Sequence, residues 1–403
     1  MNIMYITDVG FDNPNGTNRL IISMLNEFME SGHKIYLIQS HSTGTYDDIP
    51  LELKNNKNLS YDVVPKKNVP KNKFIQRYLN GIKFEFDAKK RWKAKIKNID
   101  IVLVQSHYTA WCTIWLLRKY KVKIAFNIYD IFPGAAYTNG HIKNKFIYNC
   151  FDALQKYIYK KSDLLFTLNE DTKKTLSNLG AQINKISIIP NWFDNKKVFE
   201  IPANKNRFIK KYNLDISKKY IQYAGTIGVS YDFGLILKLA KQLSYRSDII
   251  FQIVGEGLFL EDLKKEAKNM ALTNVQFLPW QSEEIISDVY SAATLQIVPL
   301  KKDVIKNSYP SKILPLMGCS RVPIISVEED SFFYKEINEK KVGFACPNGN
   351  INKLKEKILY LIDNPEVLEE YQNNAYRYVN EKFTSIENTK KMLDELKKIL
   401  RSK

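Results

Sequence analysis

Ser311 and Lys312 are the residues whose types and spacing most directly suggest chemistry. They end a polar loop, 307–312, and an apolar helix-like run, 313–317, follows them. A serine at a helix N-cap leaves backbone N–H groups pointing outward, and the helix dipole attracts anions to that end. With a lysine beside it, the pattern predicts a phosphate-binding turn. The alternative is an ordinary strand-loop-helix connection in which Lys312 is solvated.

The elements that must position this turn alternate between strands and helices. Strand-like runs of the first half lie at 3–8, 33–38, 100–104, 122–128 and 163–168, and 186–194 closes that half. A second series lies at 220–225, 249–254, 274–278, 295–299, 322–326 and 342–345, before helical segments from 351 to the end. Such βαβ repeats predict an α/β protein with two Rossmann-like, doubly wound parallel sheets. We expect one domain over 1–195, completed by a helix at 384–403, and another over 196–383.

Composition agrees with a two-domain globular protein. The 403 residues are 44% apolar and 26% charged, and each half is long enough to bury its own core. No basic leader precedes the first strand, and no apolar run approaches the roughly 20 residues that span a bilayer. The four cysteines are widely scattered and are typical of reduced core residues in a cytosolic protein. A net charge of +18 favours an anionic partner.

Three glycine turns follow strands at matching places in the two halves. They are Gly16, the run 225–228 with Gly225 and Gly228, and the run 255–257 with Gly255 and Gly257. Glycine at such a turn lets backbone approach a phosphate, although it can also serve only to relieve backbone strain. Their repetition predicts a ligand cleft between two domains.

Several short motifs occur in a fixed order along the chain. They are Gly-Thr-Ile-Gly at 225–228, Ile-Val-Gly-Glu-Gly at 253–257, Val-Gln-Phe-Leu-Pro at 275–279, Val-Pro-Leu at 298–300 and Pro-Ser-Lys-Ile at 310–313, with Met317. A Pro-Asn linker at 189–194, Gly16 with Thr17, and Asp-Ile-Phe-Pro at 130–133 precede them. In this order they resemble retaining family-4 glycosyltransferases of the GT-B fold, in the Pro-Ser-Lys branch, which build bacterial surface polysaccharides. The resemblance covers nearly the whole chain.

The resemblance implies that the second domain holds a nucleotide-sugar donor, with UDP as the family-level expectation, and that the first holds the acceptor. The donor-binding residues carried over are Gly16, Thr17, Gly225, Thr226, Gly228, Gly255, Glu256, Gly257, Leu278, Pro279, Asn307, Ser308, Ser311 and Lys312. The loops at 255–257 and 278–279 would line the base pocket, and Ser311 and Lys312 would hold the diphosphate. No cofactor or metal is expected, because the lysine and helix dipole neutralise the leaving group and the chain has no Asp-x-Asp triplet.

Some positions depart from the family pattern. Two glutamates that contact the sugar and ribose in many members are Asn307 and Pro315 here, and proline cannot hydrogen-bond a ribose through its side chain. Thr226 and the region 230–231 stand where an Arg and a Lys are usual. Sugar specificity therefore does not carry over, and a non-catalytic partner of another transferase is an alternative.

Asp130 and Tyr129 are the predicted catalytic residues. Tyr129 replaces a histidine that often precedes the acceptor-side aspartate in the family. A carboxylate beside the acceptor hydroxyl could orient it or take its proton. Because departing phosphate can take that proton in retaining enzymes of this fold, Asp130 could also act by positioning alone. Its structural alternative is to cap the turn before Pro133.

Positive charge is concentrated in 66–97. This segment contains twelve Lys and Arg and only two acidic residues, Glu85 and Asp87, so it carries +10 of the total +18. Apolar residues recur inside this segment at helical spacing: Phe74, Ile75, Tyr78, Leu79, Ile82 and Phe86, followed by Trp92 and Ile96. A basic amphipathic helix of this kind favours an anionic membrane surface. The alternative is a helix whose apolar stripe is core. No nucleic-acid-binding module is recognisable, so nucleic acid is not expected as a partner.

We therefore expect a cytoplasmic glycosyltransferase, peripheral on the inner face of the cell membrane. It would move a sugar from a nucleotide-sugar to a lipid-linked saccharide in capsule, exopolysaccharide or O-antigen synthesis, with retention of configuration. A GT-B sugar epimerase or phosphorylase is the alternative among enzymes. An epimerase would need more carboxylates and histidines around the sugar, and the chain has only four His.

Overall fold

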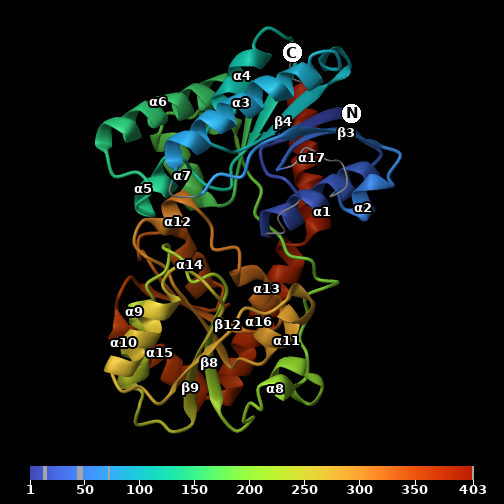
Figure 1. Cartoon of the computed structure of the whole chain (residues 1–403). Helices are drawn as coiled ribbons and strands as arrows, with labels where there is room; N and C mark the ends of the chain where they lie inside the picture. The colour runs from blue at the N-terminus through green and yellow to red at the C-terminus, as the bar shows by residue number, and fades with distance from the viewer. Residues whose placement is uncertain (12–15, 43–48, 71–72, 402–403) are drawn as a thin grey trace. The chain divides into compact units, whose positions relative to one another are not determined.

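The computed structural model describes residues 1–11, 16–42, 49–70 and 73–401, and its described residues form two compact units (Figure 1). Unit 1 comprises those of Met1–Asn191, Asn307–Tyr309 and Ser385–Lys403, and unit 2 comprises Trp192–Lys306 and Pro310–Thr384. Residues 13–15 of the break predicted after the first strand, 71–72 of the basic segment and 402–403 of the last helix lie outside the described residues.

Unit 1 is built on a seven-stranded parallel sheet. Its strands are β1 (Asn2–Thr7), β2 (Lys34–His41), β3 (Leu59–Pro65), β4 (Ile101–Gln105), β5 (Lys123–Asn127), β6 (Leu164–Thr167) and β7 (Ile186–Ile188), in the order β3-β2-β1-β4-β5-β6-β7. The central strands are buried on both faces, which explains why they read as continuous apolar runs rather than as alternating ones.

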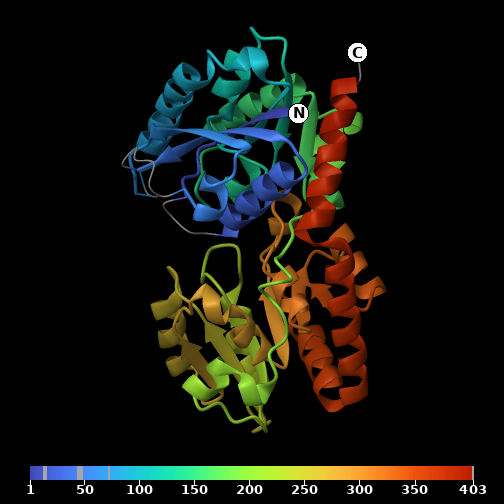
Figure 2. The same cartoon turned by 90° about the vertical axis from the view of Figure 1, so that its right-hand side faces the viewer.

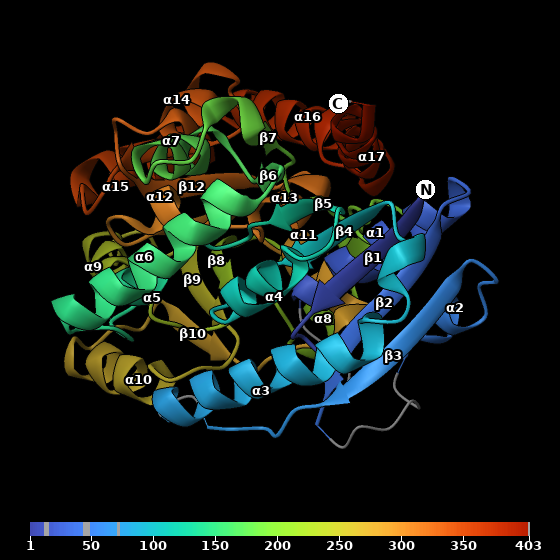
Figure 3. The ribbon, with the colours of Figure 1, turned by 90° about the horizontal axis from the view of Figure 1, so that it is seen from above.

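Helices cover both faces of this sheet. On one face α3 (Phe74–Trp92), α4 (Ala110–Leu117) and α6 (Lys145–Lys161) lie side by side, as Figure 3 shows from above. On the other face α1 (Gly16–Glu30) contacts α2 (Leu51–Lys54) and α17 (Ser385–Arg401), so the end of the chain packs within unit 1 (Figure 2). The shorter elements of the unit are α5 (Gly134–Thr138), α7 (Glu170–Asn178) and the 3₁₀ turns Ile96–Asn98 and Ile183–Lys185.

Unit 2 has a six-stranded parallel sheet. Its strands are β8 (Lys219–Ala224), β9 (Ile249–Val254), β10 (Val275–Leu278), β11 (Leu295–Pro299), β12 (Val322–Val327) and β13 (Phe344–Pro347), in the order β10-β9-β8-β11-β12-β13. The helix α9 (Phe233–Gln242) contacts α10 (Leu260–Asn269) and α15 (Ile351–Asp363), whereas α13 (Ile313–Gly318) contacts α11 (Ile286–Ser291) and α16 (Pro365–Lys382). The remaining helices are α8 (Arg207–Lys211), α12 (Val304–Asn307), α14 (Phe332–Glu339) and the 3₁₀ turns Ala203–Lys205 and Glu283–Ile285.

The predicted pair of doubly wound parallel sheets is confirmed. In each sheet the strand order reverses at one point, between β1 and β4 in unit 1 and between β8 and β11 in unit 2. Ligands of open α/β sheets bind outside the carboxyl ends of the strands at such a reversal. The two reversals therefore mark where functional residues should gather.

The strands predicted from the sequence did not include β3, which forms the edge of the first sheet. Only Val63 and Val64 are fully buried in this strand, and Asp62 interrupts its apolar character. An edge strand that is half exposed lacks the continuous apolar run by which the other strands were recognised.

Within the described ranges, none of the helices has both the length and the apolar character needed to cross a bilayer.

Candidate functional site

The glycine loops of unit 2 are joined by backbone hydrogen bonds at the carboxyl ends of β8, β9 and β10. Gly225 N donates to Val254 O at 2.9 Å, Ile227 N to Glu256 O at 2.8 Å, and Gly255 N to Leu278 O at 3.0 Å. The residues predicted from the three motifs therefore do lie together, on one edge of the sheet and beside the point where its strand order reverses.

Two of these glycines are required by the close approach of backbone to backbone. A Cβ at Gly255 would meet the Gly225 carbonyl oxygen at 2.0 Å, and one at Gly257 would meet the Ile227 carbonyl oxygen at 2.2 Å. Gly255 also has φ +149°, which other residues rarely adopt. The loops can therefore pack this tightly only with glycine at both positions.

Lys312 reaches the first of these loops. Its Nζ donates to the Tyr223 hydroxyl at 2.6 Å and lies 3.9 Å and 4.2 Å from the ring centroids of Tyr223 and Tyr231. A Cβ at Gly225 would lie 2.8 Å from the same Nζ. Burial lowers the pKa of Lys312 to about 7, whereas the two rings favour the cation. No carboxylate forms an ion pair with Lys312 in the described part of the chain, so the ammonium lacks an anion.

The predicted capping role of Ser311 is wrong. The helix α13 begins at Ile313, Lys312 is its N-cap residue, and no side chain caps it. Ser311 instead lies in the preceding turn, where Ile313 N donates to Pro310 O at 3.0 Å and Leu314 N to Ser311 O at 3.2 Å. Because α13 has only six residues, its dipole is a weak source of anion attraction. The predicted binding of a phosphate at this turn therefore depends on Lys312.

Other predicted donor residues present surface around these loops. Thr226, Glu256, Pro279 and Ser311 are exposed, and Gly228 and Leu278 are partly buried. A ligand could reach them without displacing core side chains. Their assignment to the base and diphosphate remains a prediction.

Asn307 and Ser308 belong to unit 1. Ile131 N donates to Asn307 O at 2.8 Å, and Ser308 pairs with Asp130 in an isolated antiparallel bridge. A Cβ at Gly134 would meet Asn307 Oδ1 at 2.3 Å. These two residues therefore lie against the predicted acceptor-side loop, and their assignment to the donor stays a prediction.

A cavity of about 310 Å³ lies in unit 1 at the reversal point of its sheet. It brings together residues that follow β1, β4 and β5, and its lining includes Asp8, Thr17, His107, Tyr108, Tyr129 and Asp130. Thr17, predicted on the donor side, thus shares a cavity with the predicted catalytic pair. Gly16 begins α1 just before it.

The two predicted catalytic residues differ in their surroundings. Asp130 keeps solvent-exposed surface, yet the protein around its carboxyl group desolvates it enough to raise its pKa to about 6. Burial raises the pKa of Tyr129 well above its usual value, so this phenol stays protonated at neutral pH. Close to neutral pH, Asp130 can therefore be either a carboxylate that accepts a proton or a neutral acid that donates one.

Sequence reasoning missed Asp8 and His107, which line the same cavity. Both come directly after strands on either side of the reversal, Asp8 after β1 and His107 two residues after β4. That position alone could have marked them as candidates.

Residues 74–92 of the basic segment form α3, and the apolar residues of this helix fall on two different faces. Phe84, Ala88 and Trp92 are core residues, and the Trp111 Nε1 donates to the Tyr78 hydroxyl at 2.9 Å, so Tyr78 is not a free stripe residue. A different stripe is open to solvent: Ile75 is 74% exposed, Leu79 59% and Phe86 45%, with Ile82 partly buried between them. The side chain of Phe74 lies outside the described residues. The helix thus has a core face and a separate exposed apolar face.

No group of three or more His, Cys, Asp or Glu side chains is placed to hold a metal ion within the described ranges.

Two family models match the chain. The one described as Glycosyltransferase Family 4 matches residues 14–197, and the one described as Glycosyl transferases group 1 matches residues 204–378. A probable glycosyltransferase of Pseudomonas aeruginosa, WbjE, is 23% identical over 283 residues, which cover 69% of this chain and 70% of that protein.

Solved structures give the same result for the fold. HepE of Anabaena in complex with UDP matches with a TM-score of 0.76 at 12% identity, covering 99% of this chain and all of that one. WaaG, a glycosyltransferase involved in lipopolysaccharide biosynthesis, matches with a TM-score of 0.70 at 13% identity over the full length of both chains. At these identities the likeness establishes the fold, which is GT-B.

Proposed function

Because the chain belongs to the family-4 glycosyltransferases of the GT-B fold, we propose that it transfers a sugar from a nucleoside diphosphate donor to a saccharide acceptor. Unit 2 binds the donor and unit 1 binds the acceptor. The reaction retains the anomeric configuration and needs no metal.

The observation that carries this proposal is Lys312. It is a partly buried cation that pairs with no carboxylate of the described residues, and it is held over Tyr223 and Tyr231 beside the glycine loop that begins at Gly225. A charge in such a place is costly until an anion joins it. Departure of a nucleoside diphosphate develops negative charge, which a preorganised cation and nearby backbone N–H groups can stabilise. The UDP bound by HepE supports UDP as the nucleotide.

The acceptor we propose is a lipid-linked saccharide of bacterial surface polysaccharide synthesis, reached at an anionic membrane. The involvement of WaaG in lipopolysaccharide biosynthesis supports this class of product. The exposed stripe Ile75, Leu79 and Phe86 runs along α3, and Lys90, Arg91 and Lys93 are exposed at the end of the same helix. Apolar residues that insert and cations that meet anionic headgroups form the usual combination of an interfacial helix.

Calorimetric titration with a panel of nucleoside diphosphates and nucleotide sugars tests the donor part. We expect one of them to bind and its sugar to be transferred to lipid-linked acceptors from bacterial membranes, in the presence of EDTA. The anomeric signal of the product in NMR reports whether configuration is retained. Nucleotide binding without any hydrolysis or transfer would favour the non-catalytic alternative, for which the replacements at Asn307 and Pro315 leave room.

Sedimentation with vesicles tests the membrane part. We expect binding to vesicles that contain phosphatidylglycerol and little binding to neutral ones, with a loss of affinity as salt rises. Replacing Ile75 and Leu79 by Gln should remove the binding that survives high salt. The matched control is Ile216→Gln, a residue of unit 2 that is also 74% exposed. Equal binding of the double variant and the control would assign the stripe another role.

A further inference from the structure

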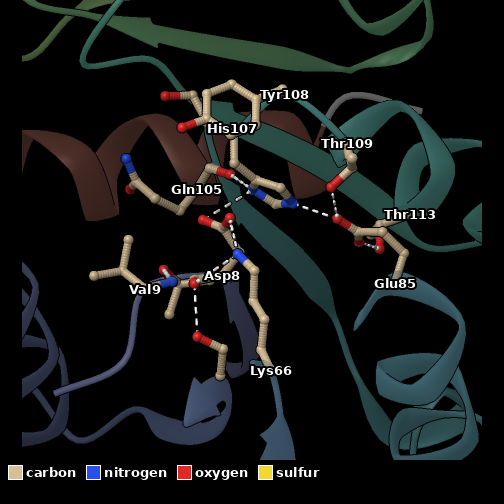
Figure 4. Close-up of polar contacts among 12 residues, drawn as sticks. Asp8, Val9, Lys66, Glu85, Gln105, His107, Tyr108, Thr109 and Thr113 are labelled. Atoms are coloured by element: carbon tan, nitrogen blue, oxygen red, sulfur yellow. Dashed lines mark hydrogen bonds and ion pairs between the residues drawn. The ribbon is translucent and has the colours of Figure 1, made fainter. Parts of the chain in front are cut away.

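Four ionisable side chains from separate parts of unit 1 meet beside the cavity at its reversal point (Figure 4). They are Asp8 after β1, Lys66 after β3, Glu85 on α3 and His107 after β4. Two are acidic and two are basic. None of them was singled out for a role by its neighbours in the sequence.

Like His107, Asp8 lines the cavity. Its Oδ2 accepts from Lys66 Nζ at 2.6 Å, and its Oδ1 lies 3.9 Å from His107 Nδ1. The backbone carbonyl oxygen of Asp8 accepts from Ser40 Oγ at 2.6 Å. These contacts fix Asp8 from several directions. Only 11% of its side chain is exposed, so a ligand could reach a small part of the carboxylate.

His107 is fixed in turn by two acceptors. Its Nδ1 lies 2.6 Å from the Gln105 carbonyl oxygen, and its Nε2 lies 2.5 Å from Glu85 Oε1. Because a carbonyl and a carboxylate both accept, each ring nitrogen must donate and the ring carries two protons. Glu85 is completely buried and also accepts from Thr109 Oγ1 at 2.8 Å and Thr113 Oγ1 at 2.5 Å. In this arrangement His107 is therefore an imidazolium.

The rest of the cavity lining includes hydroxyl groups, aromatic groups and the carboxyl group of Asp130. Thr17, Tyr108 and Phe132 line it together with Asp8, and the rings of Tyr108 and Phe132 lie 5.4 Å apart, centroid to centroid. The Arg77 guanidinium donates to the Tyr108 hydroxyl at 2.8 Å and fixes that ring. A volume of about 310 Å³ lies at the small end of the range for ligand pockets, roughly 300–1,000 Å³. It suits one ring with several hydroxyl groups rather than an extended chain.

We propose that this cavity binds an uncharged sugar ring, the terminal residue of the acceptor, and that Asp8 is the carboxylate that accepts hydrogen bonds from its hydroxyl groups. Lys66 and the Glu85–His107 pair are positioning residues that hold Asp8 in place and ionised. The assignment to an acceptor rests on the proposed function, whereas the binding of a sugar ring does not.

The charges around Asp8 support this assignment. Burial alone would raise the pKa of Asp8, but His107, Lys66 and Arg77 lower it overall. Burial alone would lower the pKa of His107, but Asp8 and Glu85 raise it to about 9. Because the two acids and two bases compensate one another, this group of four carries no net charge. A neutral ligand with hydroxyl groups can use the remaining lone pairs of Asp8 without disturbing that balance.

The test is titration of the full-length protein with methyl glycosides of glucose, galactose and N-acetylglucosamine, followed by saturation-transfer NMR and without any nucleotide. We expect at least one to bind, and Asp8→Asn to weaken it by about tenfold or more, the scale of one charge-assisted hydrogen bond. Affinity for nucleoside diphosphate should stay unchanged, since unit 2 binds it. If the protein turned over no nucleotide-sugar, the proposed function would be contradicted, but the titration with glycosides would still test whether the cavity binds a sugar ring.

Substitutions of Lys66 test whether this residue positions Asp8 for binding or only stabilises the fold. Lys66→Met should weaken glycoside binding and lower the melting temperature, whereas Lys66→Arg should keep both, and Lys57→Met serves as the exposed control. The double variant Asp8→Asn with Lys66→Met removes both charges of the pair and should recover stability without recovering binding. Recovery of binding in that double variant, full binding by Asp8→Asn, or no glycoside binding by the natural protein would each overturn the proposal.

Discussion

Lys312 offers the sharpest test of the donor site, because the same property that suits it to a diphosphate should weaken the ligand-free fold. Lys312→Met keeps the length of the side chain and removes the ammonium that lies over Tyr223 and Tyr231. We expect this variant to be more stable than the natural protein and to bind nucleoside diphosphates less well. The two effects have opposite signs, which an ordinary surface lysine would not produce.

The size of the stability effect follows from the pKa of Lys312. Burial lowers this pKa to about 7 from its usual 10.5, which corresponds to a destabilisation of roughly 4 kcal/mol near pH 7. Attraction to two aromatic rings offsets part of it, roughly 1–2 kcal/mol. Lys312→Met should therefore raise the free energy of unfolding by roughly 2–3 kcal/mol at pH 7. Because the folded-state pKa is depressed, the deficit is complete below pH 7 and disappears as pH rises toward 10.5.

Urea denaturation at pH 7 and pH 9.5, with Lys238→Met as the exposed control on α9, measures this difference. The gain in stability should shrink at the higher pH. Calorimetry with nucleoside diphosphate should show a loss of ten- to hundredfold in affinity, as expected for one charge-assisted hydrogen bond. A variant that binds nucleotide normally would refute the role of Lys312 in diphosphate binding. A stability gain that is the same at both pH values would refute the lowered pKa of Lys312.

Three further predictions concern separate residues. Gly255→Ala should cost roughly 2–4 kcal/mol of unfolding free energy, because its Cβ would meet Gly225 O at 2.0 Å, whereas Gly228→Ala, with only Thr226 Cγ2 at 3.8 Å, should cost less than about 1 kcal/mol by the same denaturation measurement. Asp130→Asn should leave nucleotide affinity unchanged and lower the rate of transfer, and it should remove the fall in rate below the Asp130 pKa of about 6; undiminished transfer would make Asp130 structural. Glu85→Gln should reduce the pH dependence that His107 gives to stability. The raised pKa of about 9 stabilises the fold fully below pH 6.5, and roughly 3 kcal/mol is lost as pH rises through 9; a variant that loses as much between pH 6.5 and 9 as the natural protein would contradict the pairing.

The parallel strands were predictable because burial on both faces leaves a simple trace in the sequence. Strands such as β9 and β11 begin and end at the residues expected, Ile249–Val254 and Leu295–Pro299. The trace fails where burial is one-sided, as in β3 with Asp62. It also fails on α3, where helical spacing identified apolar positions without showing which face is core. Tyr78 and Leu79 look alike in that pattern, yet one is bonded to Trp111 and the other is 59% exposed.

The glycine loops and the turn with Lys312 were also predictable, because residues adjacent in the sequence determine the backbone conformation of each. The cap assigned to Ser311 was wrong because Pro310 and Ser311 form a turn and the helix starts two residues later. The group around Asp8 has no such local signature. The consecutive members Asp8, Lys66, Glu85 and His107 lie 19 to 58 positions apart along the chain, and only the strand order of the first sheet brings them together.

The two sites differ most in how their charges are balanced, and this difference indicates what each should bind. Lys312 has aromatic rings and a hydroxyl around it and no carboxylate partner in the described part of the chain, so its charge is left for an incoming anion to neutralise. Asp8 and Glu85 are already matched by Lys66 and His107, so this group of four has hydrogen-bonding capacity to offer and no net charge of its own. A buried charge without a partner favours binding of an opposite charge, whereas a compensated group favours a neutral polar ligand. A diphosphate at the first site and sugar hydroxyl groups at the second are the two ligands that a sugar transferase must tell apart.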